Sequence, residues 1–244
     1  MRDRAMTFDA ARGNDGKADL PGDLTPIDRY LSLGDRAYAS LKDSLIRGAL
    51  RPGTKLTMRS IARAFEVSTT PARDAITRLL GEGALVNLGP KTVVVPYLTQ
   101  DVLDEVTAIR LPLEGLAAEK ATAQVTEADL VQLETLQDKI NTGLDAANYA
   151  DALHANYDFH FLIYRRAAMP RLVSIIEALW LRIGPSFNDL YPEFAQSRQG
   201  VSNHLWALRG IRDVDPLAVR AAIENDIRSG HRRLSNCLAE QRRA

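Results

Sequence analysis

The chain has 244 residues, and its 31 Lys and Arg balance 31 Asp and Glu, so the formal net charge is zero. That length allows two domains, each with its own core, and the balanced charge excludes a protein that is basic over its whole surface. The single cysteine, Cys237, excludes an internal disulfide and favours a reducing, cytoplasmic location. No apolar run is long enough to span a bilayer, and none follows Arg2 and Arg4 as in a secretory signal, so we expect no membrane partner.

The first part of the chain divides into an arm and a helix. Residues 1–32 are rich in Asp, Gly and Pro and predict a flexible N-terminal arm. Apolar residues then recur at helical spacing from Tyr38 to Ile46. They predict a first helix that stops at Gly48, just before a turn at Pro52 and Gly53.

Residues 59–80 predict two short helices joined by a tight turn. Apolar residues at 61, 62 and 65 give the first helix one apolar edge, and those at 72, 76, 79 and 80 give the second an apolar stripe. Ser68 or Thr69 can cap the second helix, whose exposed start carries small hydroxyls and Arg73. A helix tip of this kind can enter a DNA major groove, although a helical hairpin in an ordinary core would show the same pattern.

The segment after these helices changes period. Residues 85–88 and 92–96 are β-branched or apolar runs separated by Gly89, Pro90 and Lys91, which predicts a hairpin with a basic tip. Helix, helix-turn-helix and hairpin in this order predict a winged helix over residues 33–97, hence a DNA-binding domain. This segment holds 10 Lys and Arg against 5 Asp and Glu, whereas residues 98–244 hold 16 against 20. The surplus of positive charge therefore lies where DNA phosphates would bind.

From Leu98 onward the pattern favours helices and no strand. The predicted helices span roughly 99–123, 126–147, 149–168, 170–190, 200–212 and 215–241. The predicted fold is thus mainly α: a winged helix-turn-helix followed by an all-α bundle over residues 98–244. Such a bundle can enclose a cavity, where bundle proteins build ligand and metal sites.

Four polar residues of this bundle are candidate metal ligands. Asn156 and His160 are four residues apart and share a helix face, and His204 lies beside an apolar stripe. Asp226 falls on the inward side of the last helix, where a carboxylate needs a partner. Two imidazoles, a carboxylate and an amide oxygen suit a Zn, Ni, Mn or Fe ion. Spacing alone favours polar residues satisfied by their neighbours. His231, about 140° around the last helix from Asp226, is a weaker substitute ligand.

Arg110 is a candidate effector-binding residue. It lies mid-helix in a largely apolar stretch. A surface arginine whose stem follows an apolar face is the alternative explanation. The planar guanidinium fork matches a carboxylate. A metal ion and an arginine that face one cavity would favour a small organic acid.

The segment 36–96 resembles the DNA-binding domain of the GntR family of bacterial transcription regulators. The resemblance is carried by "IRGALRPGTKL", by "RSIARAFEVSTTPARDAITRLLGEGAL" and by the short wing. It implies that Arg59 contacts the DNA backbone and that the tips of the recognition helix and the wing also bind DNA. These tips hold Ser68, Thr69, Thr70, Arg73, Gly89 and Lys91. Thr69 stands where many relatives carry an arginine that could bind guanine, so the operator base preference stays open.

Residues 101–230 resemble the effector-binding FCD domain of the FadR branch of this family, in its shorter, VanR-like version with six helices. The matching patterns are "IRLPLEGLAAEKA", "NYDFHFLIYRRAAMPRL" and "NHLWALRGIRDVDPLAVRAAIENDI". In many relatives four ligands hold a divalent metal, and the matching positions here are Asn156, His160, His204 and Asp226. An amide replaces the usual acid at the first position and an acid replaces the usual histidine at the last, so ligand number and net charge are retained. We expect a modified but working site, with Zn or Ni favoured over Mn or Fe. Relatives commonly carry an arginine near the effector at the position of Arg110.

These observations together predict a ligand-responsive transcription regulator, a repressor and not an enzyme. Its expected partners are double-stranded operator DNA, a small carboxylate effector and a second copy of the chain, because dimer symmetry is mirrored in near-palindromic operators. Effector binding would shift the two winged helices through the linker at residues 96–99. Two alternatives remain: a sensor whose effector is the ion itself, and a metal-dependent enzyme. No general base is evident near the cluster, and a winged helix has no evident use in such an enzyme.

Overall fold

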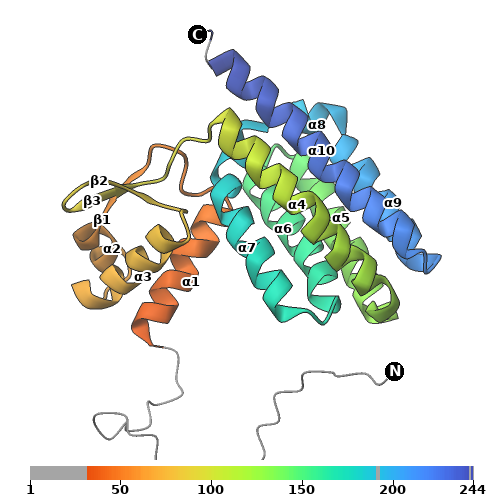
Figure 1. The fold of residues 1–244 in the computed structure, drawn as a ribbon, viewed down its shortest axis with the longest axis horizontal. Coiled ribbons are helices and arrows are strands. Elements are labelled where there is room, and N and C mark those ends of the chain that lie inside the picture. Colours follow the sequence, from red (N-terminus) through yellow and green to blue (C-terminus); the bar gives the residue numbers. More distant parts are fainter. Residues whose placement is uncertain (1–31, 191–192, 242, 244) are drawn as a thin grey trace, which may run out of the picture. The chain divides into compact units, whose positions relative to one another are not determined.

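The computed structural model describes residues 32–190, 193–241 and 243, so residues 1–31 of the predicted N-terminal arm lie outside the described residues. The fold is mainly helical, with one small antiparallel sheet near its beginning (Figure 1). The predicted fold class is therefore confirmed. Among the helices that the structure describes, none has the length and apolar character needed to cross a membrane.

The first helices and the sheet form a winged helix. Ser32 and Asp35 form a capping box that starts α1, and Thr57 and Ser60 form a second one that starts α2. Fully buried side chains such as Leu45 hold these elements around one core. The elements are α1 (Leu33–Ile46), β1 (Lys55–Thr57), α2 (Met58–Ala64), α3 (Thr69–Gly81), β2 (Val86–Gly89) and β3 (Thr92–Val94).

The sheet has one strand more than the sequence predicted. Its order is β1-β3-β2, and β3 pairs antiparallel with both neighbours, so that Val93 lies opposite Leu56 on one side and Asn87 on the other. Strands β2 and β3 are the predicted hairpin. Strand β1 is only three residues long and ends at Thr57, the cap of α2. Such a short segment shows no alternation of polar and apolar residues, and this is why the prediction missed it.

In the described residues after Leu98, six long helices follow, as predicted. The fourth predicted helix was extended too far, because α7 ends at Ile183 and gives way to a 3₁₀ segment that begins at Gly184 and Pro185. A proline cannot donate the hydrogen bond that would continue an α-helix, and this explains the early end. The elements are α4 (Gln100–Ala121), η1 (Thr122–Gln124), α5 (Glu127–Asp145), α6 (Tyr149–Arg166), α7 (Pro170–Ile183), η2 (Gly184–Leu190), α8 (Glu193–Ser197), α9 (Gln199–Arg212) and α10 (Pro216–Gln241).

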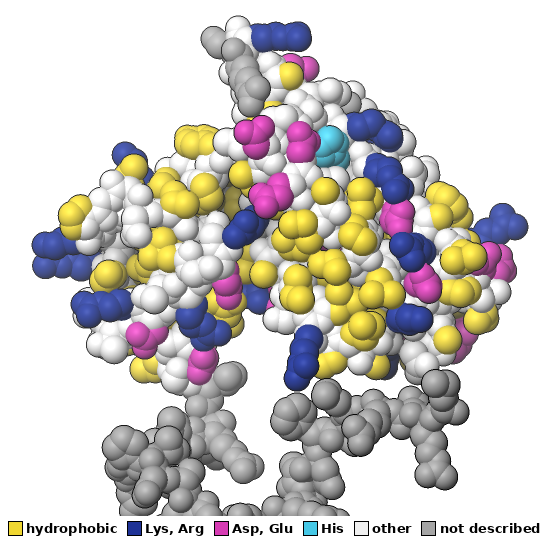
Figure 2. Space-filling model, in the orientation of Figure 1, with side chains coloured by type: hydrophobic (Ala, Val, Ile, Leu, Met, Phe, Trp, Pro, Cys, Tyr) yellow, Lys and Arg dark blue, Asp and Glu magenta, His cyan; other side chains and the backbone are white. Residues whose placement is uncertain are grey.

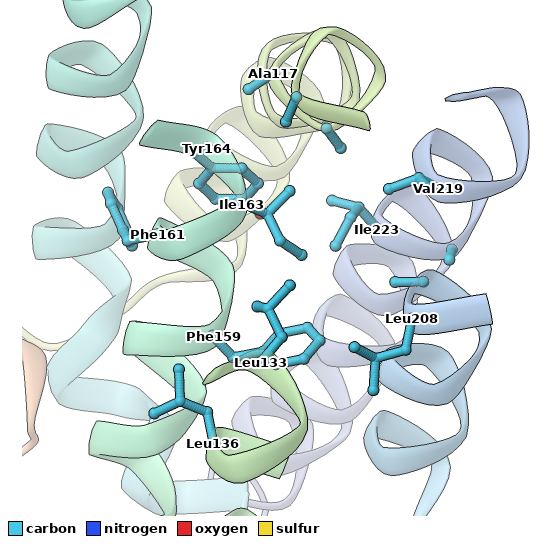
Figure 3. Packing of buried hydrophobic residues seen from close by; sticks show 14 of the residues in the cluster. Ala117, Leu133, Leu136, Phe159, Phe161, Ile163, Tyr164, Leu208, Val219 and Ile223 are labelled. Atoms are coloured by element: carbon cyan, nitrogen blue, oxygen red, sulfur yellow. The ribbon is translucent and has the colours of Figure 1, made fainter. Parts of the chain in front are cut away.

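The helices after the wing pack around a continuous apolar core (Figure 3). Leu133 of α5, Phe159 and Ile163 of α6, Leu208 of α9 and Ile223 of α10 are all buried and contribute to it. Burying an aliphatic or aromatic side chain of this size contributes about 1.5–3 kcal/mol. This packing fixes which faces of α6, α9 and α10 turn inward, and those faces carry the polar residues described next.

Candidate functional site

The start of α3 carries the residues predicted to read DNA. Ser68, Thr69, Thr70 and Arg73 are all exposed. Ser68 occupies the N-cap position, but its side chain makes no capping hydrogen bond, which corrects the expected cap. The first N–H groups of α3 and these hydroxyls are thus available to an external acceptor. A helix start of this kind can bind phosphate oxygens or base edges.

Arg59 on α2, and Gly89 and Lys91 at the tip of the wing, are exposed as well. Across residues 32–190, 193–241 and 243, no ion pair engages Arg59, Arg73 or Lys91. Arg78 differs, because it pairs with Asp35 at 2.7 Å and lies 3.7 Å from the ring centroid of Tyr38. Arg59, Arg73 and Lys91 are therefore unpaired, while Arg78 supports the internal packing of the winged helix.

Three of the four predicted metal ligands converge inside the helical part. His160 of α6, His204 of α9 and Asp226 of α10 place their ligand atoms within 4.8 Å of one another. The Nε2 atoms of the two histidines lie 3.2 Å apart, and Asp226 Oδ2 lies 3.4 Å from His160 Nε2. Both histidines are 1% exposed. Residues far apart in sequence thus form one polar cluster of two buried histidines and a partly buried aspartate.

The surroundings of His204 keep its ring neutral. Burial lowers the pKa of His204 most strongly, Asp226 raises it in part and His160 lowers it, so that the pKa falls to about 3. Nδ1 of His204 lies 2.8 Å from Oε1 of Gln137, and the ring stacks on Phe159 at 4.2 Å. Nδ1 of His204 donates to the side-chain amide oxygen of Gln137, so Nε2 carries no proton and its lone pair points toward the cluster. A neutral imidazole held by an outer hydrogen bond is the form that binds metals.

The cluster fits a divalent ion. Bonds of 2.0–2.2 Å from zinc to nitrogen or oxygen place neighbouring ligand atoms of a tetrahedral site about 3.3–3.6 Å apart. The two short distances in the cluster, 3.2 and 3.4 Å, match that spacing. Burial would raise the pKa of Asp226, but its interactions with His160, His204 and Asn203 outweigh burial and lower that pKa to about 2. The donor set is then two imidazoles and an ionised carboxylate.

A cavity adjoins the cluster. Asn156, the fourth predicted ligand, lines it together with Asp226 and Arg110, and aliphatic side chains such as Leu103 and Ile227 form other walls. The cavity encloses about 50 Å³, enough for only a few water molecules, each of which needs about 10–15 Å³. Within the described residues, the Asn156 side chain makes no hydrogen bond. The cavity thus holds the predicted amide and arginine beside the carboxylate of the cluster.

Arg110 lies in this cavity but is not a free cation. It is 6% exposed, and its Nε and Nη2 donate to the two oxygens of Glu114, with 3.1 Å from Nη2 to Oε2. The guanidinium also lies 4.7 Å from the ring centroid of Trp180. Burial would lower the pKa of Arg110, but Glu114 more than offsets this and raises it. Only the remaining N–H groups of Arg110 are available to a ligand in the cavity.

His231 is not part of the cluster. It lines the cavity, but its Nε2 bonds to Asp104 Oδ1 at 2.6 Å, which links α10 to α4. Asp226 thus takes the place in α10 for which His231 was the weaker candidate.

Several residues of the site were not predicted. Glu114, Tyr164 and Trp180 form a buried network beside Arg110, and Gln137 and Asn203 contact His204 and Asp226. The only sequence signal for Glu114 and Tyr164 is helical spacing, since Glu114 follows Arg110 by four residues and Tyr164 follows His160 by four. Their pairing with each other joins two helices and is set by packing.

A winged helix with unpaired cations at its recognition-helix and wing tips, followed by a helical bundle with this polar cluster, defines a class of DNA-binding regulators. Two family models match the chain: "Bacterial regulatory proteins, gntR family" over residues 33–95 and "FCD domain" over residues 105–229. The chain belongs to the GntR family and carries an FCD domain, so it is a transcription regulator and not an enzyme.

Relatives support this assignment along most of the chain. The HTH-type transcriptional regulator McbR of Escherichia coli is 32% identical over 189 residues, which cover 77% of this chain and 86% of McbR. The HTH-type transcriptional repressor RspR of E. coli is 24% identical over 57% of this chain and 61% of its own length. The solved structure of E. coli McbR/YncC superposes with a TM-score of 0.80 at 30% identity, covering 85% of this chain and 99% of that one.

Proposed function

We propose that this regulator is a cytoplasmic homodimeric repressor whose helical domain, residues 98–244, binds a small carboxylate through a divalent metal ion. Residues 33–97 form its DNA-binding domain, preceded by an arm over residues 1–32. The observation that carries the proposal is the convergence of two imidazole nitrogens and a carboxylate oxygen beside the cavity that Arg110 lines. Repression is inferred from relatives such as RspR, which is named as a repressor.

DNA binding is assigned to Arg59, Ser68, Thr69, Thr70, Arg73, Gly89 and Lys91. Arg73→Ala is expected to weaken operator binding by about 1–3 kcal/mol, because an exposed cation near the start of α3 contacts a phosphate or a base edge. If the lost contact is to a phosphate, the slope of log affinity against log salt concentration falls by about 0.9. Fluorescence anisotropy with the chain's own promoter region, measured over a salt series, gives both quantities.

Arg209→Ala is the matched control for this measurement. Arg209 lies on α9 outside the winged helix, its side chain is 82% exposed, and it pairs only loosely with Asp213 at 3.6 Å. We expect wild-type operator binding from this variant. If the wild type and the Arg73 variant bind the operator with equal affinity, Arg73 does not contact DNA.

The metal ion is assigned to Asn156, His160, His204 and Asp226, with Zn or Ni favoured over Mn or Fe. With neutral histidines and an ionised Asp226, a divalent ion leaves a net positive charge that attracts an anion. The cavity is small, and its aliphatic and aromatic walls are interrupted by the polar side chains of Thr107, Arg110, Asn156, Asp226, Ser229 and His231. These properties favour a small organic acid, with its carboxylate directed at the ion and at the free N–H groups of Arg110.

Helix α7 provides a route from the cavity to the winged helix, in addition to the linker at residues 96–99. Trp180 of α7 lines the cavity, and Glu177, one turn earlier, bonds to Lys42 of α1 at 2.6 Å and to the Tyr157 hydroxyl at 2.8 Å. Leu181 of α7 belongs to the apolar core of the winged helix. An effector that moves α7 would therefore move α1 as well.

A second apolar face supports the homodimer. Ile109 and Pro112 lie exposed on α4, and the neighbouring Leu113 and Leu116 are partly buried against the bundle core. Ile109 is 39% exposed and Ile175 of α7 is 52% exposed. Figure 2 shows apolar side chains gathered over α4 and α7. A helix with apolar residues on two faces needs a partner on each, and a second copy of the chain would cover this face.

The effector proposal is tested by an operator-binding assay on metal-stripped protein. Small carboxylates are expected to leave operator affinity unchanged without metal, and to lower it at least about tenfold once Zn²⁺ or Ni²⁺ is restored, a typical allosteric coupling. The panel uses short monocarboxylates, hydroxy acids and dicarboxylates of similar size. The matched neutral amides serve as controls, because they lack the charge that the ion attracts.

Each outcome of this assay separates one alternative. A response to metal alone would identify an ion sensor and contradict the carboxylate proposal. A response to carboxylates in stripped protein would remove the ion from effector binding. No response to any combination would contradict both the effector and the ion as regulators of DNA binding.

A further inference from the structure

Tyr164 connects the metal cluster to the buried ion pair of Arg110. It follows His160 by four residues on α6, so the two side chains lie on the same face of the helix. Its hydroxyl oxygen lies 2.6 Å from Glu114 Oε2 and 3.1 Å from His160 Nδ1. Tyr164 and Glu114 are both fully buried, so water does not compete for these contacts.

The direction of both hydrogen bonds is fixed by Glu114. Its carboxylate faces Arg110, which donates to both oxygens, and Trp180, whose Nε1 donates at 3.0 Å. An ionised carboxylate only accepts hydrogen bonds, so the Tyr164 hydroxyl must donate to it. Arg110 and Trp180 can only donate to Glu114, so the Tyr164 hydroxyl at 2.6 Å adds a third donor to the same carboxylate.

The hydroxyl oxygen of Tyr164 can then only accept from His160. Nδ1 of His160 therefore carries a proton, and Nε2 is the nitrogen that faces His204 and Asp226. Within the described residues, Nδ1 of His160 has no other hydrogen-bond partner. Which ring nitrogen of a histidine binds a metal is set by the hydrogen bond that the other nitrogen makes.

We propose that Glu114 and Tyr164 are positioning residues that hold the proton of His160 on Nδ1 and so reserve Nε2 for the metal ion. The inference deepens the proposed function, on which its metal part rests, whereas its tautomer part stands without an ion. Glu114 also bonds to Arg110, so the same carboxylate orients the arginine of the cavity and, through Tyr164, the metal ligand His160.

Loss of the Tyr164 hydroxyl would favour the other tautomer. Without an acceptor beside Nδ1, the tautomer with its proton on Nε2 becomes the more stable one, because Asp226 Oδ2 lies 3.4 Å away and can accept a hydrogen bond from Nε2. That proton would occupy the position that the ion needs. Loss of an outer hydrogen-bond partner of this kind typically weakens metal binding about 10–100-fold.

The test is Tyr164→Phe in the full-length, metal-stripped protein, titrated calorimetrically with Zn²⁺ and separately with Ni²⁺. The expected result is a dissociation constant about 10–100 times that of the wild type. Tyr157→Phe is the matched control, because it removes another α6 hydroxyl that donates to a carboxylate, Glu177 Oε1 at 2.8 Å. That hydroxyl is not bonded to His160, so this variant should bind both metals as the wild type does.

A second measurement reads the tautomer directly. The chain has four histidines, so selective ¹⁵N labelling gives a spectrum that can be assigned by substitution. In metal-free protein, His160 should carry its proton on Nδ1 in the wild type and in Tyr157→Phe. In Tyr164→Phe the proton should move to Nε2.

The two measurements separate the inference from the proposed function. A folded Tyr164→Phe protein with an unchanged His160 tautomer, or with wild-type metal affinity, would overturn the positioning role. If the wild type binds neither metal, the proposed ion fails, and the tautomer measurement still decides whether Glu114 and Tyr164 orient His160. A circular dichroism melt of each variant establishes that it is folded.

Discussion

Glu114→Ala is expected to lower the free energy of unfolding by about 3–5 kcal/mol. Glu114 is 0% exposed, and its carboxylate accepts hydrogen bonds from Arg110, Tyr164 and Trp180. Its removal leaves a buried guanidinium without its counter-ion and two buried donors without an acceptor. Urea unfolding followed by circular dichroism, with the wild type measured alongside, gives the change in unfolding free energy.

Glu119→Ala on the same helix is the control for this prediction. Glu119 is 25% exposed and pairs with Arg220 at 2.9 Å near the surface, so its loss should cost at most about 1 kcal/mol. The charge itself is tested by adding Arg110→Met to Glu114→Ala. The double variant should be more stable than Glu114→Ala alone, because the unpaired cation is gone. If the double variant is less stable than Glu114→Ala, the free energy of unfolding lost in Glu114→Ala comes from lost packing and not from the unpaired charge.

This ion pair changes how an Arg110 variant would be interpreted. The sequence indicated Arg110 as an effector anchor, and i,i+4 spacing allowed a bond to Glu114. In the structure Arg110→Ala would also leave Glu114 buried with fewer partners. A weaker effector response in that variant would then combine a lost anchor with a disturbed site, and comparison with the double variant separates the two.

The predictable part of the fold was its regular, periodic part. The hairpin and the six long helices follow from spacing and from breaks at residues such as Pro170 and Pro216. Strand β1 has no pattern of its own, because its three residues owe their conformation to pairing with β3. The 3₁₀ segment after Ile183 continues the apolar pattern of α7, so periodicity alone does not reveal where the α-helix ends.

The candidate site was predictable residue by residue but not as a network. Inward-facing positions on three helices could be recognised for His160, His204 and Asp226, and the family resemblance proposed that they meet. The sequence does not specify that Tyr164 reaches Glu114, which is 50 residues away, because that contact depends on how α4 and α6 pack. Residues that hydrogen-bond to the candidate ligands, such as Tyr164 and Glu114, can therefore be identified only from the structure.

Replacing both His160 and His204 with alanine is expected to abolish metal uptake. Two of the three converging donors are lost, and Asp226 and Asn156 cannot hold a transition-metal ion against dialysis. Bound metal, measured by inductively coupled plasma mass spectrometry after loading with Zn²⁺ or Ni²⁺, should fall from stoichiometric to background. Undiminished metal in this variant would place the ion elsewhere in the chain.

The chain supplies its own control, because its other two histidines lie outside the cluster. His154 pairs with Asp158 at 3.3 Å and His231 with Asp104 at 2.6 Å. His154→Ala with His231→Ala removes as many imidazoles and should bind metal as the wild type does. A ligand that binds only the folded state stabilises it by about 2.7 kcal/mol at 100 times its Kd. Added metal should therefore raise the melting temperature of the wild type and of this control, and leave that of the His160 and His204 variant unchanged. This result would show that the ion binds the folded protein at His160 and His204.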